Sequence, residues 1–316
     1  MRADCERHMF KIGTRGSALA LWQAHEVKRR LENAHPDLKI ELVIFKTRGD
    51  SILDRPLSEV GGKGLFTKEL EDALLAGEIQ IAVHSLKDMP TTLPEGLVLG
   101  AIPARGDVRD VLIHRAGEAV SDLSLIGTSS LRRACLAKRR WPRSEITSIR
   151  GNVPTRMGRV QEEGERRVDA VLLAMAGILR LELNQEEGYD YLPLNPEQWI
   201  PAASQGALAI ECRQDDEETL AHLAPLHHEQ TARCVRAERA FLAGVEGDCR
   251  VPVGGWASAD GDTIRLKAFV GAPDGAEYVE GVMIGSGEPE ELGAALAQDL
   301  LSKGGADILN ALRASS

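Results

Sequence analysis

Strand-like and helix-like segments alternate along most of this chain, and that alternation constrains the fold more than any other feature. Apolar runs typical of buried strands occur at 10–13, 40–45 and 79–83. Between them, helical periodicity begins at an N-cap at Ser17 and again covers 65–75. Because parallel strands need crossover connections, this alternation predicts a parallel or mixed sheet covered by helices. The expected apolar face of the first helix comprises Ala20, Ala24, Val27 and Leu31.

The alternation restarts after a linker-like segment at 103–107, which contains proline, glycine and charged residues. The elements expected next are a strand ending at 127, strands at 146–149 and 170–173, a helix from Ser129 or Ser130 to Arg140, and a helix over 153–161. Prolines between 192 and 201 indicate a second linker. Residues 207–211 have the pattern of a further strand, which we expect to return to the first sheet.

The pattern changes at Glu229, where a long helix to about Val245 precedes a glycine-rich loop. Three strand-like runs follow without intervening helices, which predicts a separate α+β module. These runs lie at 256–258, 264–270 and 278–284. We therefore expect two similar α/β lobes and a smaller α+β C-terminal domain. The expected boundaries are 1–104 with 202–225 returning for the first lobe, 105–201 for the second, and 226–316 for the C-terminal domain.

The composition argues against several classes of protein. With 316 residues, 43% hydrophobic and 27% charged, the chain resembles an ordinary globular protein of more than one domain. Its net charge of −10 argues against a general nucleic-acid binder. The longest uncharged apolar run, 170–179, is far shorter than the roughly 20 residues of a membrane helix, and the N-terminal residues lack the apolar segment of a secretory signal.

Cysteine and histidine usage predicts neither disulfide bonds nor a metal site. The five cysteines are widely spaced and include no C-x-x-C pair. The eight histidines include no H-E-x-x-H motif. We expect a cytoplasmic, metal-free protein.

Arginine is concentrated between residues 128 and 167. This segment has 11 basic and 4 acidic residues, a net charge of +7 in a chain whose total is −10. Two of its arginines, Arg150 and Arg156, follow the strand expected at 146–149. An acidic protein that gathers arginine beside turns is expected to hold a ligand with many negative charges.

Two strand-to-helix turns combine arginine with a hydroxyl residue. Arg15 precedes Ser17 in the first turn, and Ser130 precedes Arg132 and Arg133 in the second. The free N–H groups at a helix N-terminus favour an anion, and a guanidinium adds charge-assisted hydrogen bonds. The simpler interpretation is that the serines only cap helices and the arginines face solvent. The repetition of the arrangement favours anion binding.

The turn after the strand at 79–83 is a second candidate site, because strand ends face the ligand crevice in open α/β sheets. Asp88 is a candidate acid, base or cation stabiliser, and Lys87 would keep it ionised or bind an anion itself. Alternatively, Asp88 forms an Asx-type turn with the residues that follow it. We interpret His84 as a hydrogen-bonded packing residue.

Cys249 differs from the other cysteines because it lies in the glycine-rich loop and is followed by Arg250. A neighbouring cation suits a reactive thiolate. Asp248 on the other side would raise the pKa of the thiol. The spacing alone leaves both a functional and a structural thiol open.

Several long blocks, taken together, resemble the porphobilinogen deaminase family, also called the hydroxymethylbilane synthases. The resemblance runs from about Lys11 to the C-terminus. The blocks are TRGSALALWQA at 14–24, TRGD at 47–50, GGKGLF at 61–66, AVHSLKDMP at 82–90, GTSSLRR at 127–133, RGNV at 150–153 and EGDCRVP at 246–252.

The resemblance implies an enzyme that joins four porphobilinogen molecules head to tail, with release of ammonia, into the linear tetrapyrrole hydroxymethylbilane. It implies a dipyrromethane primer held by a thioether to Cys249, and a catalytic aspartate at Asp88 that stabilises the cationic azafulvene left when ammonia departs. It also implies two periplasmic-binding-protein-like α/β lobes plus a smaller domain that carries the cysteine. The implied cofactor contacts are Lys87, Ser130, Arg132 and Arg133. The implied substrate contacts are Arg15, Ser17, Lys63, Arg150, Arg156 and Arg180. We expect a monomer without nucleic-acid or membrane partners.

Four residues depart from the family's usual pattern: Asp248, Pro154, Glu59 and Leu179. Asp248 bears on cofactor attachment, and Glu59 weakens local attraction for anions. A non-catalytic bilobal binding protein for an anionic small molecule is the alternative function, although it would not need Cys249. An effector-sensing part of a transcription regulator is disfavoured, because no N-terminal helix-turn-helix pattern is present.

Overall fold

The computed structural model describes residues 9–47, 49, 65–246 and 251–314. The chain divides into two compact units. Of the described residues, unit 1 contains 9–47, 49, 65–104 and 208–229, and unit 2 contains 105–207, 230–246 and 251–314.

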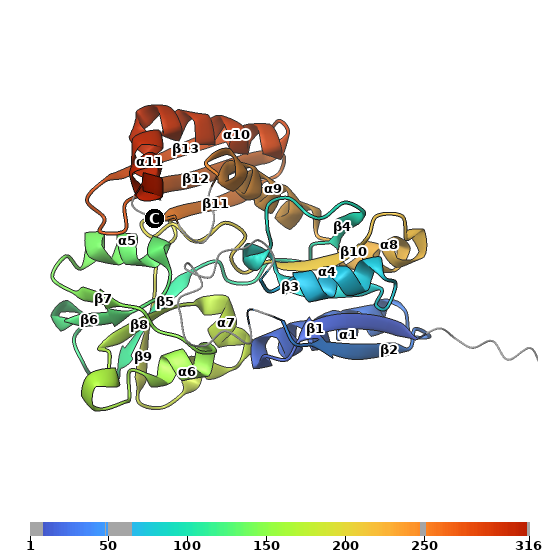
Figure 1. The fold of residues 1–316 in the computed structure, drawn as a ribbon, viewed down its shortest axis with the longest axis horizontal. Helices are drawn as coiled ribbons and strands as arrows, with labels where there is room; N and C mark the ends of the chain where they lie inside the picture. Colours follow the sequence, from blue (N-terminus) through green and yellow to red (C-terminus); the bar gives the residue numbers. More distant parts are fainter. Residues whose placement is uncertain (1–8, 48, 50–64, 247–250, 315–316) are drawn as a thin grey trace, which may run out of the picture. The chain divides into compact units, whose positions relative to one another are not determined.

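The described residues of unit 1 form a five-stranded mixed sheet with the strand order β2-β1-β3-β10-β4 (Figure 1). Its strands are β1 (Phe10–Arg15), β2 (Ile40–Phe45), β3 (Ile81–Ser85), β4 (Leu97–Ala101) and β10 (Leu208–Arg213). β1 runs parallel to β2 and β3, whereas β10 is antiparallel to β3 and β4. The predicted return of 207–211 to the first sheet is confirmed. β4 was not predicted from the sequence.

Helices cover both faces of this sheet. α1 (Ala18–Ala34) is capped by Ser17 and buries the four apolar residues predicted for its inner face. α4 (Lys68–Leu75) packs against Ala82 through Leu70 and Leu74, while the flanking β3 residues face the α1 cluster. Because successive strand residues point to opposite faces, α1 and α4 lie on opposite sides of the sheet. The other helical segments in the described part of unit 1 are the 3-10 turns η1 (Leu86–Asp88) and η5 (Ala224–Leu226), and α8 (Glu217–Leu223).

A second five-stranded mixed sheet, in the described part of unit 2, has the order β7-β6-β8-β5-β9. Its strands are β5 (Asp110–Arg115), β6 (Leu125–Gly127), β7 (Glu145–Thr147), β8 (Ala170–Ala174) and β9 (Tyr189–Pro193). The prediction that the second linker starts at 192 was wrong, because β9 continues to Pro193. β9 is an edge strand, where a missing N–H is tolerated.

The helices of this lobe begin where the strands end. α5 (Leu131–Arg140) is capped by Ser130, one of the two predicted caps. α6 (Val153–Gly158) ends earlier than the predicted 161, and α7 (Met175–Arg180) follows β8 directly. The 3-10 turns are η2 (Val120–Asp122), η3 (Gly164–Arg166) and η4 (Leu183–Gln185).

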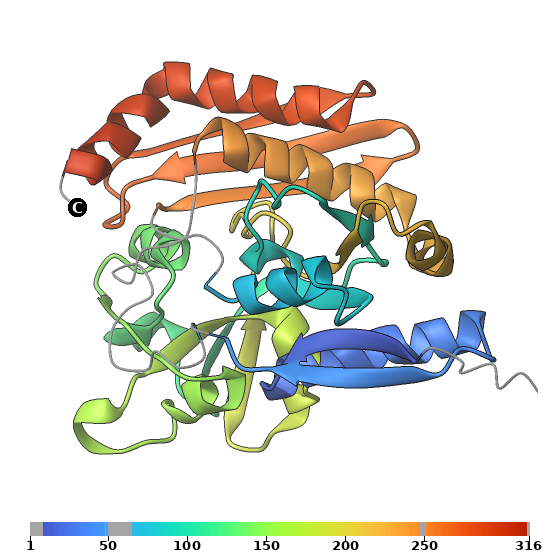
Figure 2. The same cartoon turned by 45° about the vertical axis from the view of Figure 1, so that its right-hand side comes forward.

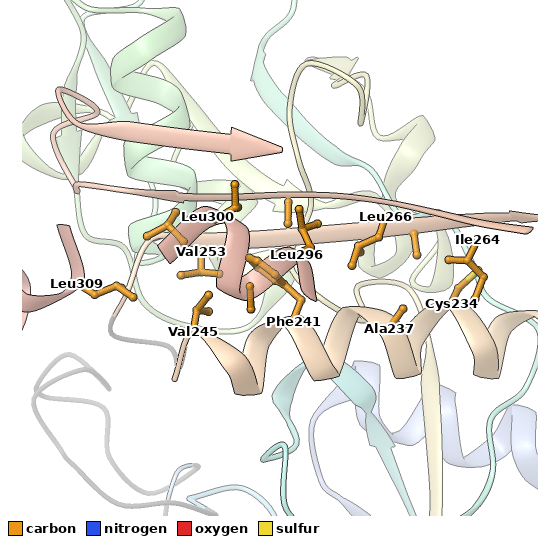
Figure 3. Close-up of a cluster of buried hydrophobic side chains, with 14 of the residues drawn as sticks. Cys234, Ala237, Phe241, Val245, Val253, Ile264, Leu266, Leu296, Leu300 and Leu309 are labelled. Carbon is orange, nitrogen blue, oxygen red and sulfur yellow. The ribbon is translucent and has the colours of Figure 1, made fainter. Parts of the chain in front are cut away.

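The C-terminal part of unit 2 contains the predicted long helix and antiparallel strands. Its elements are α9 (Glu229–Gly244), β11 (Val253–Asp260), β12 (Thr263–Gly271), β13 (Tyr278–Gly285), α10 (Pro289–Leu300), the kinked segment η6 (Leu301–Gly305) and α11 (Ala306–Ala314). α9 and α10 run alongside the strands (Figure 2). Phe241 of α9 meets Leu296 of α10 and Leu266 of β12 in one apolar core (Figure 3). A Cβ at Gly293 would lie 2.2 Å from the Ala237 carbonyl oxygen, so α9 and α10 pack this closely only because residue 293 is glycine.

Contacts inside unit 2 join this part to the second lobe. The buried carboxylate of Glu238 on α9 accepts hydrogen bonds from both terminal nitrogens of Arg105, at 2.6 and 3.0 Å, and from the backbone N–H groups of Ser204 and Ala257. The predicted fold class of two α/β lobes plus a smaller α+β part is confirmed. Among the described helices, none combines the length and apolar character needed to cross a bilayer.

Candidate functional site

A pocket of about 70 Å³ lies in unit 1, where β1 and β3 end. This space is several times the roughly 10–15 Å³ that a single water needs. Its walls combine one cation, one carboxylate, hydroxyl groups and apolar surface. The lining residues are Arg15, Ser17, Leu19, Ala20, Gln23, Phe66, Thr67, Val83, His84, Ser85, Asp88 and Met89.

The turn between β1 and α1 places two of the predicted substrate contacts in this pocket. The Oγ of Ser17 accepts a hydrogen bond from the Ala20 N–H at 3.3 Å and so caps α1. Buried Thr14 ties the turn down by donating to the Ala20 carbonyl at 3.1 Å. The Arg15 guanidinium lies 4.2 Å from the centre of the Phe66 ring. A cation over an aromatic face is held in place, so Arg15 presents its charge at a defined position.

The turn after β3 presents Asp88 between two anchored neighbours. Leu86 is fully buried and Met89 is almost so, whereas Asp88 is exposed and Lys87 is half-buried. Within the described ranges, no hydrogen bond or ion pair engages the Asp88 carboxylate, and the Asx-turn interpretation finds no support there. The carboxylate is therefore available to a ligand in the pocket.

A buried charged cluster adjoins the same pocket. His84 lines the pocket, and its Nε2 lies 3.1 Å from the Glu211 Oε2 on β10. Glu71 of α4 is also buried nearby, and burial raises the pKa of its carboxyl, with the Glu211 charge adding to the rise. His84 is buried and hydrogen-bonded, as the packing interpretation predicted, but it also reaches the pocket.

The second lobe buries a cluster dominated by arginine. Arg132 donates to the Asp110 Oδ2 at 2.7 Å, and Arg133 donates to the Asp110 Oδ1 at 2.7 Å through Nη2 and at 3.1 Å through Nε. Trp199 and Gln205 also donate to this carboxylate, at 2.7 and 2.8 Å. Burial opposes ionisation, but the two guanidinium groups outweigh it and hold the pKa of Asp110 well below its usual range. The predicted cofactor contacts Arg132 and Arg133 thus lie in the interior, with one more positive charge than Asp110 neutralises.

The other predicted arginine contacts are half-buried in unit 2. Arg156 donates through Nε to the Gly151 carbonyl at 2.7 Å, and Arg180 donates through Nη2 to the Gly206 carbonyl at 2.6 Å. Arg150 follows β7. The Ser130 Oγ accepts from the Arg133 N–H at 3.4 Å, so capping is the role that its geometry shows.

Two predicted site residues, Cys249 and Lys63, lie outside the described residues, as do Glu59 and Asp248. Pro154 is accommodated in the first turn of α6, where a backbone N–H has no helical partner to lose. Among the described residues, no group of three His, Cys, Asp or Glu side chains could hold a metal ion.

The acidic residues of the two clusters, Glu211 and Asp110, were not predicted as site residues from the sequence. Glu211 interrupts the apolar run of β10, and Asp110 begins the apolar run of β5. A carboxylate inside a buried-strand pattern needs a partner, because ionised groups are almost never fully buried alone. That signal was present in the sequence, but the identity of each partner depends on tertiary packing.

Several solved structures of low sequence identity are similar to parts of this chain. The effector-binding domain of a BenM variant is 18% identical, with 74% of this chain and 96% of that chain covered, at a TM-score of 0.41. The periplasmic VFT2 domain of Bordetella pertussis BvgS is 13% identical, with 69% and 86% covered, at 0.41. YhfZ from Shigella flexneri is 15% identical, with 76% and 98% covered, at 0.36.

Two family models match most of the sequence. Residues 10–221 match the porphobilinogen deaminase dipyromethane cofactor binding domain, and residues 232–302 match the porphobilinogen deaminase C-terminal domain. These matches decide against the non-catalytic binding protein. With both domains matched in order, the chain belongs to the porphobilinogen deaminase family.

Proposed function

We propose that the pocket of unit 1 is where this enzyme binds and activates porphobilinogen, with Asp88 as the reacting carboxylate. The enzyme class, the place in tetrapyrrole biosynthesis and the dipyrromethane cofactor follow from the two family matches. The observation that carries the proposal is that Asp88, Arg15 and Ser17 line one pocket.

The pocket residues suit the reaction that joins four porphobilinogen molecules into hydroxymethylbilane. Each porphobilinogen carries an acetate and a propionate. The Arg15 guanidinium, which is positioned over the Phe66 ring, can bind one of these carboxylates. Ser17, Lys63 and Lys87 add polar groups to the proposed binding surface. Loss of ammonia leaves positive charge on the substrate, which the Asp88 carboxylate stabilises. The same carboxylate lies at the pocket to orient the pyrrole N–H.

The charge of the buried arginine cluster in unit 2 suits a cofactor that carries carboxylates. Arg132 and Arg133 are buried around a single carboxylate, Asp110, which leaves a surplus positive charge away from water. Such a charge favours an anionic ligand, because attraction is strong where water is excluded. The dipyrromethane cofactor supplies the pyrrole to which the first substrate unit is joined. We propose Cys249 as its attachment residue. Ser130, Lys87, Arg132 and Arg133 are the proposed cofactor contacts, and Arg150, Arg156 and Arg180 the proposed contacts to the growing product.

We place the enzyme in the cytoplasm as a monomer that binds neither nucleic acid nor membranes. Its net charge of −10 supports the absence of a nucleic-acid partner. Size-exclusion chromatography with light scattering tests the monomer.

The decisive experiment compares Asp88→Asn with wild type in porphobilinogen consumption and ammonia release. We expect turnover to fall by about 10²–10³-fold, because an amide cannot offset the developing positive charge. Binding of the cofactor, measured by intact mass, should be retained. Asp37→Asn, which changes an exposed aspartate outside the pocket, is the matched control and should turn over like wild type. Near-normal turnover by Asp88→Asn would refute the assigned role.

A further inference from the structure

One nitrogen of the His84 imidazole forms a hydrogen bond with the buried carboxylate of Glu211. β3 and β10 are antiparallel, and their register pairs His84 with Ala209 and Ala82 with Glu211. His84 and Glu211 are therefore diagonal neighbours on one face of the sheet. The Nε2–Oε2 distance is 3.1 Å, and the two side chains are 4% and 0% exposed. An ionised carboxylate can only accept, so Nε2 carries the proton and Nδ1 is left as the acceptor nitrogen of the neutral ring.

His84 also belongs to the pocket, because it is one of the residues that line it. Its Nδ1 has no hydrogen-bond partner among the described residues. Arg15 and Asp88 are the charged groups that share the pocket wall. A pocket histidine with one nitrogen fixed by a carboxylate and the other without a partner has the arrangement of a general base.

Two carboxyl groups, those of Glu71 on α4 and Glu211 on β10, are buried near His84. The Oε1 atom of each has no hydrogen-bond partner among the described residues. Burial and the charge of Glu211 raise the pKa of Glu71, so a proton in this pair of carboxyl groups is held on Glu71. The negative charge of Glu211 then offsets the positive charge that His84 gains when it accepts a proton from the pocket.

Resting on the proposed function of this pocket, we infer that His84 is the proton acceptor when porphobilinogen units are joined. The ring carbon that has formed the new carbon–carbon bond must lose its hydrogen. The C–H bond breaks, its electron pair returns to the pyrrole ring and restores aromaticity, and the proton goes to Nδ1 of His84. For the second and later units, that ring is itself derived from substrate. Water entering the pocket then removes the proton. Asp88 stabilises charge, and His84 moves the proton.

Two variants separate this role from a structural one. In His84→Gln, the rate of unit addition should fall by about 10²–10⁴-fold, and the acidic limb of its pH profile should disappear, because no imidazole titrates. In Glu211→Gln the amide oxygen still accepts from Nε2–H but carries no charge. The rate of unit addition should then fall while the KM for porphobilinogen stays that of wild type, because the imidazolium that forms on proton transfer loses a neighbouring anion.

The matched control is His114→Gln. His114 is a buried histidine of β5 whose Nδ1 lies 3.1 Å from the Arg115 carbonyl, and it is not part of the pocket. We expect His114→Gln to have the pH profile of wild type. A His84→Gln enzyme with the rate and pH profile of wild type would overturn the inference and leave the proposed function standing. A wild-type protein that consumes no porphobilinogen would overturn the proposed function, and this inference with it.

A measurement independent of turnover uses the intact wild-type protein labelled with ¹⁵N-histidine. The His84 resonances are identified by their absence from His84→Gln or, if that variant does not fold, by their shift in Glu211→Gln. The neutral ring should carry its proton on Nε2, and Nδ1 should show the chemical shift of an unprotonated nitrogen. A proton on Nδ1 of the neutral ring would overturn the inference, because that nitrogen could then not accept one.

Discussion

Each unit buries a charged cluster against its sheet, and the two clusters have opposite composition. In unit 1, Glu71 and Glu211 lie near one imidazole, that of His84. In unit 2, Arg132 and Arg133 share one carboxylate. Carboxyl and imidazole groups can gain and lose a proton, whereas a guanidinium in a protein stays charged. The unit 1 cluster can therefore change its charge, whereas the unit 2 cluster keeps a fixed excess of positive charge.

The clusters also differ in how completely their polar atoms are satisfied. Both oxygens of Asp110 accept hydrogen bonds, from Arg132, Arg133, Trp199 and Gln205. In the unit 1 cluster, by contrast, each glutamate has one buried oxygen that finds no partner in the described part of the chain. A satisfied network rigidifies the fold, whereas an unsatisfied buried group costs free energy. We therefore expect the arginine cluster to contribute more to the stability of its lobe than the glutamate cluster contributes to unit 1.

The largest change in stability should follow from Asp110→Asn. This change leaves two buried guanidinium groups without a counter-charge, and we expect the free energy of unfolding to fall by about 3–5 kcal/mol. The pKa of Asp110 is depressed in the folded state, so its contribution is present above the unfolded pKa of about 3.9 and is lost as the pH falls below it. Urea unfolding at several pH values should show wild type and variant converging below about pH 4.

The control is Glu197→Gln. Glu197 forms an ion pair with Arg265 at 2.9 Å, and its side chain is 44% exposed. An exposed pair contributes at most about 1 kcal/mol. If Asp110→Asn and Glu197→Gln lost equal amounts of unfolding free energy, the buried carboxylate would contribute no more than the exposed one. The contrast between the two clusters would then fail.

The sequence predicts most of the elements but not the partners that their side chains find. α1 and its Ser17 cap, β2, and the return of β10 were predicted because their periodicity and caps are local signals. β9 was missed because its proline favours a linker, and only its edge position makes that residue acceptable in a strand.

The candidate site shows the same limit. The sequence brought Arg15 and Asp88 forward as separate candidates, and folding brings both to one pocket. Arg132 was predicted to be a ligand contact because it follows a turn rich in hydroxyls. Its partner Asp110 lies 22 residues earlier, and this pairing comes from the packing of α5 onto the sheet. A pairing that depends on tertiary structure leaves no spacing pattern in the sequence.

Arg132→Met tests the comparison between the two clusters more closely, because it removes only the one positive charge that Asp110 does not neutralise. Burial lowers the pKa of the Arg132 guanidinium, which shows that this charge is held at a cost. Asp110 keeps Arg133 in the variant, so we expect a loss of only about 1–3 kcal/mol, the size of a hydrogen bond to a charged group. Retention of the dipyrromethane cofactor, measured by intact mass, should fall, because the interior no longer has an excess positive charge.

Arg140→Met is the matched control on the same helix, because Arg140 is exposed. It should retain both stability and cofactor. Cys249→Ser, which lacks the proposed attachment thiol, supplies the mass of the empty protein. If Arg132→Met is as unstable as Asp110→Asn, the second guanidinium is not surplus, and the proposed preference of this interior for an anion is wrong.

The smallest change in the free energy of unfolding should come from Glu71→Gln, and the sign of this change should depend on pH. Burial raises the pKa of Glu71, so the folded protein binds this proton more tightly than the unfolded chain does. The stability that this proton provides is present below the unfolded pKa of about 4.3 and is lost as the pH rises through the folded pKa. Glutamine does not titrate. The free energy of unfolding of the variant should therefore rise relative to that of wild type as the pH rises, by no more than about 1 kcal/mol near neutrality.

Thermal unfolding between pH 4 and pH 8 measures this difference, with Glu78→Gln, an exposed glutamate beyond the end of α4, as the control that should follow wild type throughout. A Glu71→Gln variant that instead loses stability steadily as the pH rises would show that ionised Glu71 supports the imidazolium of His84 as a counter-charge. The unit 1 cluster would then resemble the arginine cluster of unit 2, a fixed ion network, and the contrast between a cluster that can change its charge and a cluster of fixed charge would fail.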